Sequence, residues 1–293
     1  MPNALAIGGL LCVLGMGVGV PLGGPLASMI ACGAILAMGL PHGTLDLDLF
    51  RQTEQDATRL KILLLYLGFA SLMTGSWIVS PVVAFALFYG FAVVHFSEDW
   101  MQCGSVFLAQ GMALAMLAIP SLTHGSELNA LFAVLTGPAA STVFVDLLRL
   151  VSPVAAMVAI VTIGLLWTRG ARSDAVSGGI SLTAMAILPP IVGFALFFCL
   201  FHSPRHLRAS LDALTTSTAR GNRRTIIALT LAAAGLAAIV YIFGERLPAS
   251  DRMISASFIT LSILTLPHLA VPIVLRAMRP SISKPSVAQT ASS

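Results

Sequence analysis

The sequence predicts an all-α fold, a polytopic transmembrane helical bundle of about ten spans, and two observations predict it. Of the 293 residues, 57% are hydrophobic and only 10% are charged, whereas soluble domains carry about 25% charged residues. Apolar stretches near the length of about 20 residues needed to cross the hydrocarbon core recur from one end of the chain to the other. A water-soluble globule is therefore excluded. The net charge of +4 is spread thinly between these stretches, which excludes a nucleic-acid-binding role.

Each apolar stretch is interpreted as one membrane span. In chain order the predicted spans are 4–22, 24–42, 61–79, 80–97, 104–122, 127–146, 150–167, 177–202, 225–244 and 254–276. For 127–146 three alternatives stay open, because Gly137 and Pro138 interrupt it. That stretch could span the membrane, re-enter it, or lie on its surface.

The positions of the basic residues predict the orientation. With ten spans and the N-terminus inside, 12 of the 16 Lys and Arg residues fall on the cytoplasmic side, as the positive-inside rule expects. Arg169, Arg172, Arg246 and Arg252 are then left outside. With nine spans, the arginines between 205 and 224 would lie on the opposite side of the membrane from the basic residues near residue 51. We therefore expect a multi-pass protein of the cell inner (plasma) membrane.

The predicted domain organisation is simple. Residues 1–278 form a single transmembrane domain. Within it, 203–224 fits a short surface helix, with Ser203 as its N-cap and Pro204 at the first helical position. Residues 279–293 are rich in Ser, Pro and Ala and are expected to form a disordered cytoplasmic tail.

Histidines are the main ionisable side chains near the predicted spans. His42, His95, His202 and His206 all fall at span ends on the cytoplasmic face. Imidazole is a common ligand of iron, copper and zinc, and no cysteine accompanies these histidines, so the set suits iron. The simpler alternative is that each is a core or interface residue with its own hydrogen bond. Pro204 is expected to break the helix between His202 and His206.

Acidic residues follow two of these histidines closely. Asp46 lies four residues after His42, so on a continuing helix its carboxylate could accept the imidazole N–H and orient the ring. Glu98 and Asp99 have the same possibility beside His95. The alternative for each acid is a solvated position at a span end.

The sequence leaves the roles of the two other histidines, His268 and His124, open. His268 lies inside the last span between Pro267 and Pro272, where it could line a substrate tunnel or hydrogen-bond a carbonyl that proline leaves free. His124 is expected at the opposite face, as a helix cap or a headgroup contact. Phe96 and Phe201 stand beside two of the cluster histidines and could line an apolar pocket or simply pack between helices.

Four motifs in series resemble the Brp/Blh family of membrane-bound β-carotene 15,15′-dioxygenases. They are Pro-His-Gly-x-x-Asp at 41–46, His-Phe at 95–96, His-x-x-x-His at 202–206 and Pro-His at 267–268. Two departures from the family pattern are Ser97, where the family favours Gly, and Leu47, where it often has His. The first affects local backbone shape, and the second affects the surroundings of the metal.

The resemblance implies that 1–278 is a catalytic domain containing a non-haem iron dioxygenase site. The reaction would cleave the central 15,15′ double bond of β-carotene with O₂ and give two retinal. The cofactor would be Fe(2+), held by His42, His95, His202 and His206, with His268 a nearby pocket residue. The implied partners are β-carotene or a related carotenoid, O₂, the lipid bilayer and, downstream, a retinal-binding rhodopsin.

The same histidines and apolar spans are also compatible with other functions. A membrane transporter could use the histidine cluster as a transit site, although charged residues inside the spans, which would favour it, are scarce. A non-catalytic accessory protein could bind retinal or a carotenoid without turnover. A membrane desaturase or hydroxylase is disfavoured, because those families resemble one another in having about eight histidines and this chain has six. The accepted carotenoid, the symmetry of cleavage and the oligomeric state stay open.

Overall fold

The structure is a computed structural model that describes residues 2–44, 56–208 and 219–278. Across these ranges the regular elements are all helices and there is no strand, which confirms the all-α prediction. The predicted tail 279–293, Asp46 and residues 209–218 of the surface helix predicted over 203–224 lie outside the described residues. The single-domain assignment of 1–278 stays a prediction.

Five helical segments are long and apolar enough to cross a membrane: Leu60–Val79, Pro81–Cys103, Val106–Thr123, Pro138–Thr168 and Ala249–Val271. Three more are apolar but shorter: Pro2–Gly17, Pro25–Leu40 and Thr230–Phe243. Large apolar side chains such as Leu64, Ile160 and Phe243 are exposed on the outside of the bundle, where a lipid environment would cover them. The helices are compatible with a membrane protein, but the count of about ten spans is not confirmed.

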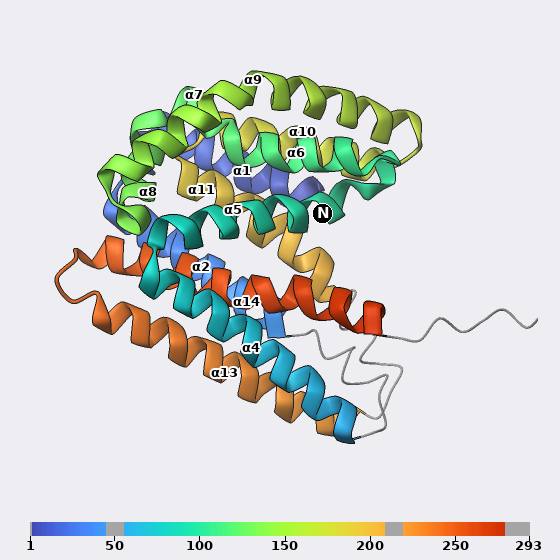
Figure 1. Cartoon of the computed structure of the whole chain (residues 1–293). Helices are drawn as coiled ribbons and strands as arrows, with labels where there is room; N and C mark the ends of the chain where they lie inside the picture. Colours follow the sequence, from blue (N-terminus) through green and yellow to red (C-terminus); the bar gives the residue numbers. More distant parts are fainter. Residues whose placement is uncertain (1, 45–55, 209–218, 279–293) are drawn as a thin grey trace, which may run out of the picture.

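The helices pack as two sets with a pair between them (Figure 1). In chain order they are α1 (Pro2–Gly17), α2 (Pro25–Thr44), α4 (Asp56–Val79), α5 (Pro81–Ser97), η1 (Glu98–Cys103), α6 (Val106–Ala118), α7 (Pro120–Thr123), α8 (Gly125–Thr136), α9 (Pro138–Thr168), α10 (Arg172–Ile187), α11 (Pro190–Phe197), η2 (Phe198–His202), α13 (Ala219–Phe243) and α14 (Ala249–Met278). One set is α2, α4, α13 and α14, and the other is α6, α8, α9 and α10. Helices α5 and α11 lie between the sets, with α5 in contact with both.

The stretch predicted as a span over 127–146 is not one helix. Helix α8 has 12 residues, a rise of about 18 Å, which is too short for a hydrocarbon core of about 30 Å. Gly137, with φ 84° and ψ 161°, separates it from α9. Pro138 then starts α9, which runs unbroken through the predicted boundary at 147–149. The 127–146 and 150–167 predictions were therefore wrong in their division: a short helix precedes one long span.

The stretch predicted as a span over 177–202 is also divided. Helix α10 ends at Ile187 and α11 begins at Pro190, and the two helices pack against each other. A Cβ on Gly193 would lie 3.1 Å from the Ala184 carbonyl oxygen, so a larger residue there would push the α10 and α11 backbones apart. This turn reverses the chain once more than the sequence predicts.

The extra reversal changes where two arginines lie. Arg205, just after η2, pairs with Asp174 in the first turn of α10. Arg169 and Arg172, which flank the start of α10, therefore lie at the same end of the bundle as Arg205. Their predicted placement at the opposite face was wrong, because it assumed a single span over 177–202.

Candidate functional site

Four histidines from three separate helical segments gather between the two helix sets. His95 lies near the end of α5, His202 ends η2, His206 follows one turn later, and His268 lies on α14. The Nε2 atoms of His95 and His202 are 3.0 Å apart. Ring centroids are separated by 4.6 Å for His202 and His206, 5.5 Å for His95 and His206, and 4.9 Å for His95 and His268. The sequence predicted three of these four as one cluster.

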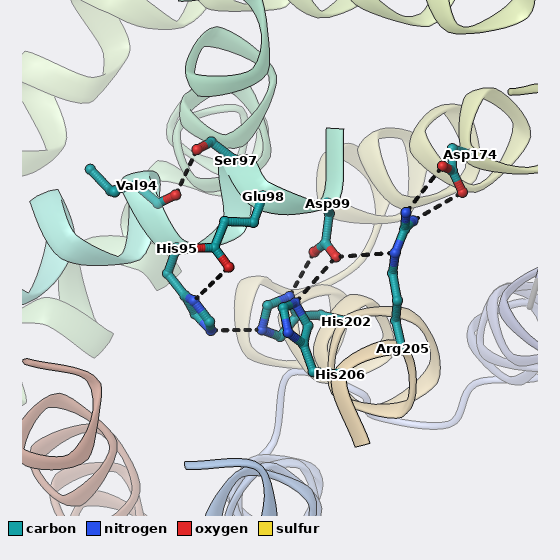
Figure 2. A network of polar contacts seen from close by, with 9 residues as sticks. All are labelled: Val94, His95, Ser97, Glu98, Asp99, Asp174, His202, Arg205 and His206. Atoms are coloured by element: carbon teal, nitrogen blue, oxygen red, sulfur yellow. Dashed lines mark hydrogen bonds and ion pairs between the residues drawn. The ribbon is translucent and has the colours of Figure 1, made fainter. Parts of the chain in front are cut away.

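A buried carboxylate, Asp99 of η1, holds the central histidine. Its Oδ2 accepts a hydrogen bond of 2.6 Å from His202 Nδ1, and its Oδ1 lies 3.6 Å from His206 Nε2. The side chains of Asp99 and His202 are both 0% exposed. A buried carboxylate is costly unless it is paired, so Asp99 and His202 are tied to each other. Figure 2 shows Asp99 lying between the His202 ring and Arg205.

This hydrogen bond decides which nitrogen of His202 is free to bind a ligand. With Nδ1 donating to Asp99, the lone pair of a neutral ring is on Nε2, which faces Nε2 of His95. Two nitrogens that each lie about 2.1 Å from one metal ion at a right angle are about 3.0 Å apart. Asp99, His202 and His206 also bring one potential ligand atom each within 4.8 Å of one another. The donor set therefore fits a metal ion that prefers imidazole.

Asp99 reaches this position because the chain changes its winding after α5. The last six residues before Gly104 form a 3₁₀ turn, η1, which has about three residues per turn instead of 3.6. Gly104 ends it with φ 78° and donates its N–H to the Met101 carbonyl over 2.9 Å. The tighter turn buries Asp99, while Glu98 stays 50% exposed with Oε2 3.9 Å from His95 Nδ1.

His202 is placed by the opposite change in winding. Residues Phe198–His202 form a π-helix, η2, a local widening that is frequent at functional sites. The chain stays helical from there to residue 208, so the predicted break at Pro204 was wrong. A proline lacks an N–H and crowds the carbonyl four residues before it, and the widened turn directly upstream accommodates both defects.

Arg205 connects the buried carboxylate to α10. Its Nη1 and Nη2 donate to the two carboxylate oxygens of Asp174 over 3.0 and 3.3 Å, and its Nε lies 3.9 Å from Asp99 Oδ1. The guanidinium carbon lies 5.7 Å from the centroid of the Phe201 ring. Paired in this way, Arg205 is a fixed positive charge beside Asp99.

The end of α2 lies beside the cluster. Ser203 donates a hydrogen bond of 2.7 Å to the Met38 carbonyl of α2. A Cβ on Gly39 would lie 2.6 Å from Leu261 Cδ2 and 3.3 Å from the Phe198 ring, so a larger residue there would force the Leu261 side chain to move. His42 follows Met38 by one turn on α2, but its side chain lies outside the described residues, as does Asp46.

An apolar cavity opens beside the imidazoles. His95 and His268 line about 480 Å³ of empty space, counting the part that opens to the outside. A second space of about 610 Å³ by the same measure adjoins it, since four side chains line both. These four are Phe88, Ala92, Phe96 and Phe194.

The other residues singled out from the sequence fall in different places. The Phe96 ring lines both spaces and meets His202 edge-on, at 4.7 Å and 87°. Phe201 lines neither of these spaces and stacks on Trp100, with centroids 5.2 Å apart. His124 precedes α8, where its Nδ1 lies 3.0 Å from Thr123 Oγ1, and it takes no part in the cluster.

Asp99, Arg205 and Asp174 are the site residues that the sequence did not single out for these roles. Asp99 was expected beside His95 or in solvent, yet it is buried and bonds His202. The only feature of the sequence that pointed to Asp99 was its position four residues after His95, at a predicted span end. Asp174 is separated from Arg205 by 31 residues, and only the reversal between α10 and α11 brings them together.

Comparisons with known proteins identify the family of the chain. The family model described as β-carotene 15,15′-dioxygenase matches residues 33–276, a range that contains all six histidines. A β-carotene 15,15′-dioxygenase from uncultured marine bacterium 66A03 is 25% identical over 271 residues, covering 83% of this chain and 92% of that protein. No solved structure matches. The resemblance noted in the sequence is confirmed: the chain belongs to the β-carotene 15,15′-dioxygenase family.

Proposed function

We propose that this protein is a non-haem iron dioxygenase that cleaves the central 15,15′ double bond of β-carotene with O₂ to give two retinal. The observation that carries the proposal is the convergence of His95, His202 and His206 at the wall of an aromatic cavity. Buried Asp99 bonds His202 and lies beside His206. The reaction balances without an added reductant, because each atom of O₂ ends on one of the two carbons of the broken double bond.

The iron ligands in this proposal are His95, His202, His206 and, from its place one turn after Met38, His42. Imidazole suits iron, and four such ligands leave coordination positions open. Bound Fe(2+) would supply the activation of O₂ beside the polyene. His268, which shares the cavity wall with His95, is assigned to contact the polyene.

The polar residues around the histidines position them. Asp99 accepts the Nδ1–H of His202 and so keeps the Nε2 lone pair aimed at His95. Arg205 lies beside Asp99 and is itself held by both oxygens of Asp174. This favours an ionised Asp99 within a buried site.

The aromatic cavity binds and orients the hydrocarbon in this proposal. Its lining is almost entirely apolar, with Phe96 and Phe194 shared by both spaces, so it favours a polyene and disfavours water. A carotenoid that lies along both spaces passes His95 and His268. Holding the central double bond there limits oxygen attack to one position.

We assign the protein to the inner (plasma) membrane, with the site near the cytoplasmic face. The support is the clustering of Arg169, Arg172 and Arg205 at the end of the bundle that holds the site, which the positive-inside rule places in the cytoplasm. β-Carotene would enter from the lipid bilayer, and a retinal-binding rhodopsin would be a consumer of the product.

Expression in β-carotene-producing cells followed by pigment analysis tests the function. Loss of β-carotene with matching appearance of retinal supports it, and purified protein should contain one iron per chain. Iron-loaded protein that makes no apocarotenoid under air would contradict it. Retinal or carotenoid binding without turnover would indicate an accessory protein, and metal uptake into vesicles would indicate a transporter.

A further inference from the structure

A buried hydroxyl group lies in the cavity away from the histidines. The Tyr89 hydroxyl oxygen is fully buried and makes no hydrogen bond within the part of the chain that the structure describes. Its ring packs against Phe85 and Phe132, with centroids 6.1 and 6.2 Å away. A buried hydroxyl without a partner is destabilising, and the apolar residues around this one include no replacement partner.

Tyr89 lines the larger of the two adjoining spaces, whose other lining side chains are all apolar. The lining comes mainly from α5, α8 and α11. The smaller space, with His95 and His268, continues it through four shared side chains. Tyr89 precedes His95 by six residues on α5, about 9 Å along the helix axis. A long ligand that passes the imidazoles can therefore extend one of its ends toward Tyr89.

We propose that this chamber binds the terminal ring of a carotenoid that carries a hydroxyl group, and that Tyr89 Oη forms a hydrogen bond with the ring oxygen. The substrate class of the enzyme then includes ring-hydroxylated carotenoids as well as the unsubstituted hydrocarbon. The proposal rests on the proposed function for its ligand class. The chamber offers the ring a large apolar surface and one polar atom, which is the usual composition of a specific small-molecule site.

The chemistry of Tyr89 favours this occupant over a plain hydrocarbon ring. An unsubstituted ring would fill the same space but leave the phenol hydroxyl without a partner. A ring hydroxyl can both donate and accept, so it satisfies Tyr89 and is satisfied by it. Since no other side chain that lines this chamber is polar, that single hydrogen bond sets the preference between the two substrates.

The test compares kcat/KM for β-carotene and for its analogue with one hydroxyl on each ring, using wild-type protein and Tyr89→Phe in the same detergent. In wild-type protein the hydroxylated substrate is expected to be used at least as well. Tyr89→Phe should lower the ratio of hydroxylated to unsubstituted kcat/KM by about tenfold, the effect of losing one buried hydrogen bond, mainly through KM. An unchanged ratio would overturn the proposal.

Tyr241→Phe is the matched control, since Tyr241 lies at the end of α13 under Arg252, away from both spaces. It should leave the ratio unchanged. Equal thermal unfolding of all three proteins would show that the variants are folded.

A binding titration separates this proposal from the proposed function. Without O₂, the Kd of each carotenoid is measured from its visible absorption change. Tighter binding of the hydroxylated carotenoid that is lost in Tyr89→Phe supports the chamber assignment even if neither carotenoid is cleaved, in which case only the dioxygenase function fails. Cleavage of β-carotene with equal Kd ratios in both proteins, or binding of neither carotenoid, would reject the chamber assignment.

Discussion

The two histidine-bearing helices between the helix sets end in opposite ways. Helix α5 tightens into the 3₁₀ turn η1 after Ser97, and α11 widens into the π-helix η2 after Phe197. The tight turn carries Asp99 and the wide turn carries His202, which meet at 2.6 Å. Regular helices place the histidines at one end of the bundle, and the two irregular turns bring the acid and the base together. The site depends on both departures from α-helical winding.

The largest expected effect comes from removing the histidine of the wide turn. His202→Ala deletes the side chain that faces both Asp99 and His95, so iron retention and retinal formation should both be abolished. Iron per chain and retinal yield are the measurements. His124→Ala, which lies outside the cluster, should keep wild-type values. Full iron content in His202→Ala would rule out His202 as a ligand.

The second largest effect is expected from a change to Asp99 in the 3₁₀ turn η1. Asp99→Asn keeps the size of the side chain but removes the carboxylate that accepts from His202 Nδ1. Loss of such a partner typically lowers metal affinity about 10- to 100-fold, which competition with a chelator would measure. Glu98→Gln, at a half-exposed neighbour 3.9 Å from His95, should change affinity much less. Equal effects of the two variants would contradict the role given to Asp99.

The end of the tight turn gives a smaller expected effect. Gly104 has φ 78°, and a Cβ there would collide with the Arg169 side chain. Gly104→Ala should therefore lower the free energy of unfolding by about 1–2 kcal/mol and weaken iron retention as η1 shifts. Gly19, with φ 84° and open space around it, is the control. Gly19→Ala should destabilise the protein by a similar amount in thermal unfolding but leave iron retention unchanged.

The smallest expected effect concerns the pair that joins the site to α10. Arg205 is 30% exposed and Asp174 13% exposed, so solvent weakens their attraction. A double-mutant cycle of Arg205→Met and Asp174→Asn should give a coupling energy of about 0.5–1 kcal/mol in thermal unfolding. Strict additivity would show that the pair is incidental.

The fold was predictable from hydrophobic length but not at every boundary. The apolar stretches 61–79 and 80–97 correspond closely to α4 and α5, since Ser80 and Pro81, which start α5, mark the boundary between them. In the 177–202 stretch the Pro189-Pro190 pair marks the turn, but Leu188 and both prolines are apolar and do not interrupt the hydropathy, so the division into spans by hydropathy missed it. A hydropathy pattern does not detect a turn that is made of apolar residues.

The site was predictable where it depends on the ends of helices and unpredictable where it depends on their winding. His95, His202 and His206 meet because their helices end at one face of the bundle. Asp99 was missed as the partner of His202 because a 3₁₀ turn rotates it away from the direction that an α-helix would give. Phe201 was expected near a pocket, but on the π-helix it points to Trp100 instead.

The bond between His95 and His202 joins residues 107 positions apart. During synthesis, α5 leaves the ribosome well before η2 does. His95 and Asp99 therefore enter the membrane before their partner His202 has been made available. In the iron site that we propose, metal loading would have to follow the insertion of α11, and a nascent chain interrupted before that point would lack His202 and His206.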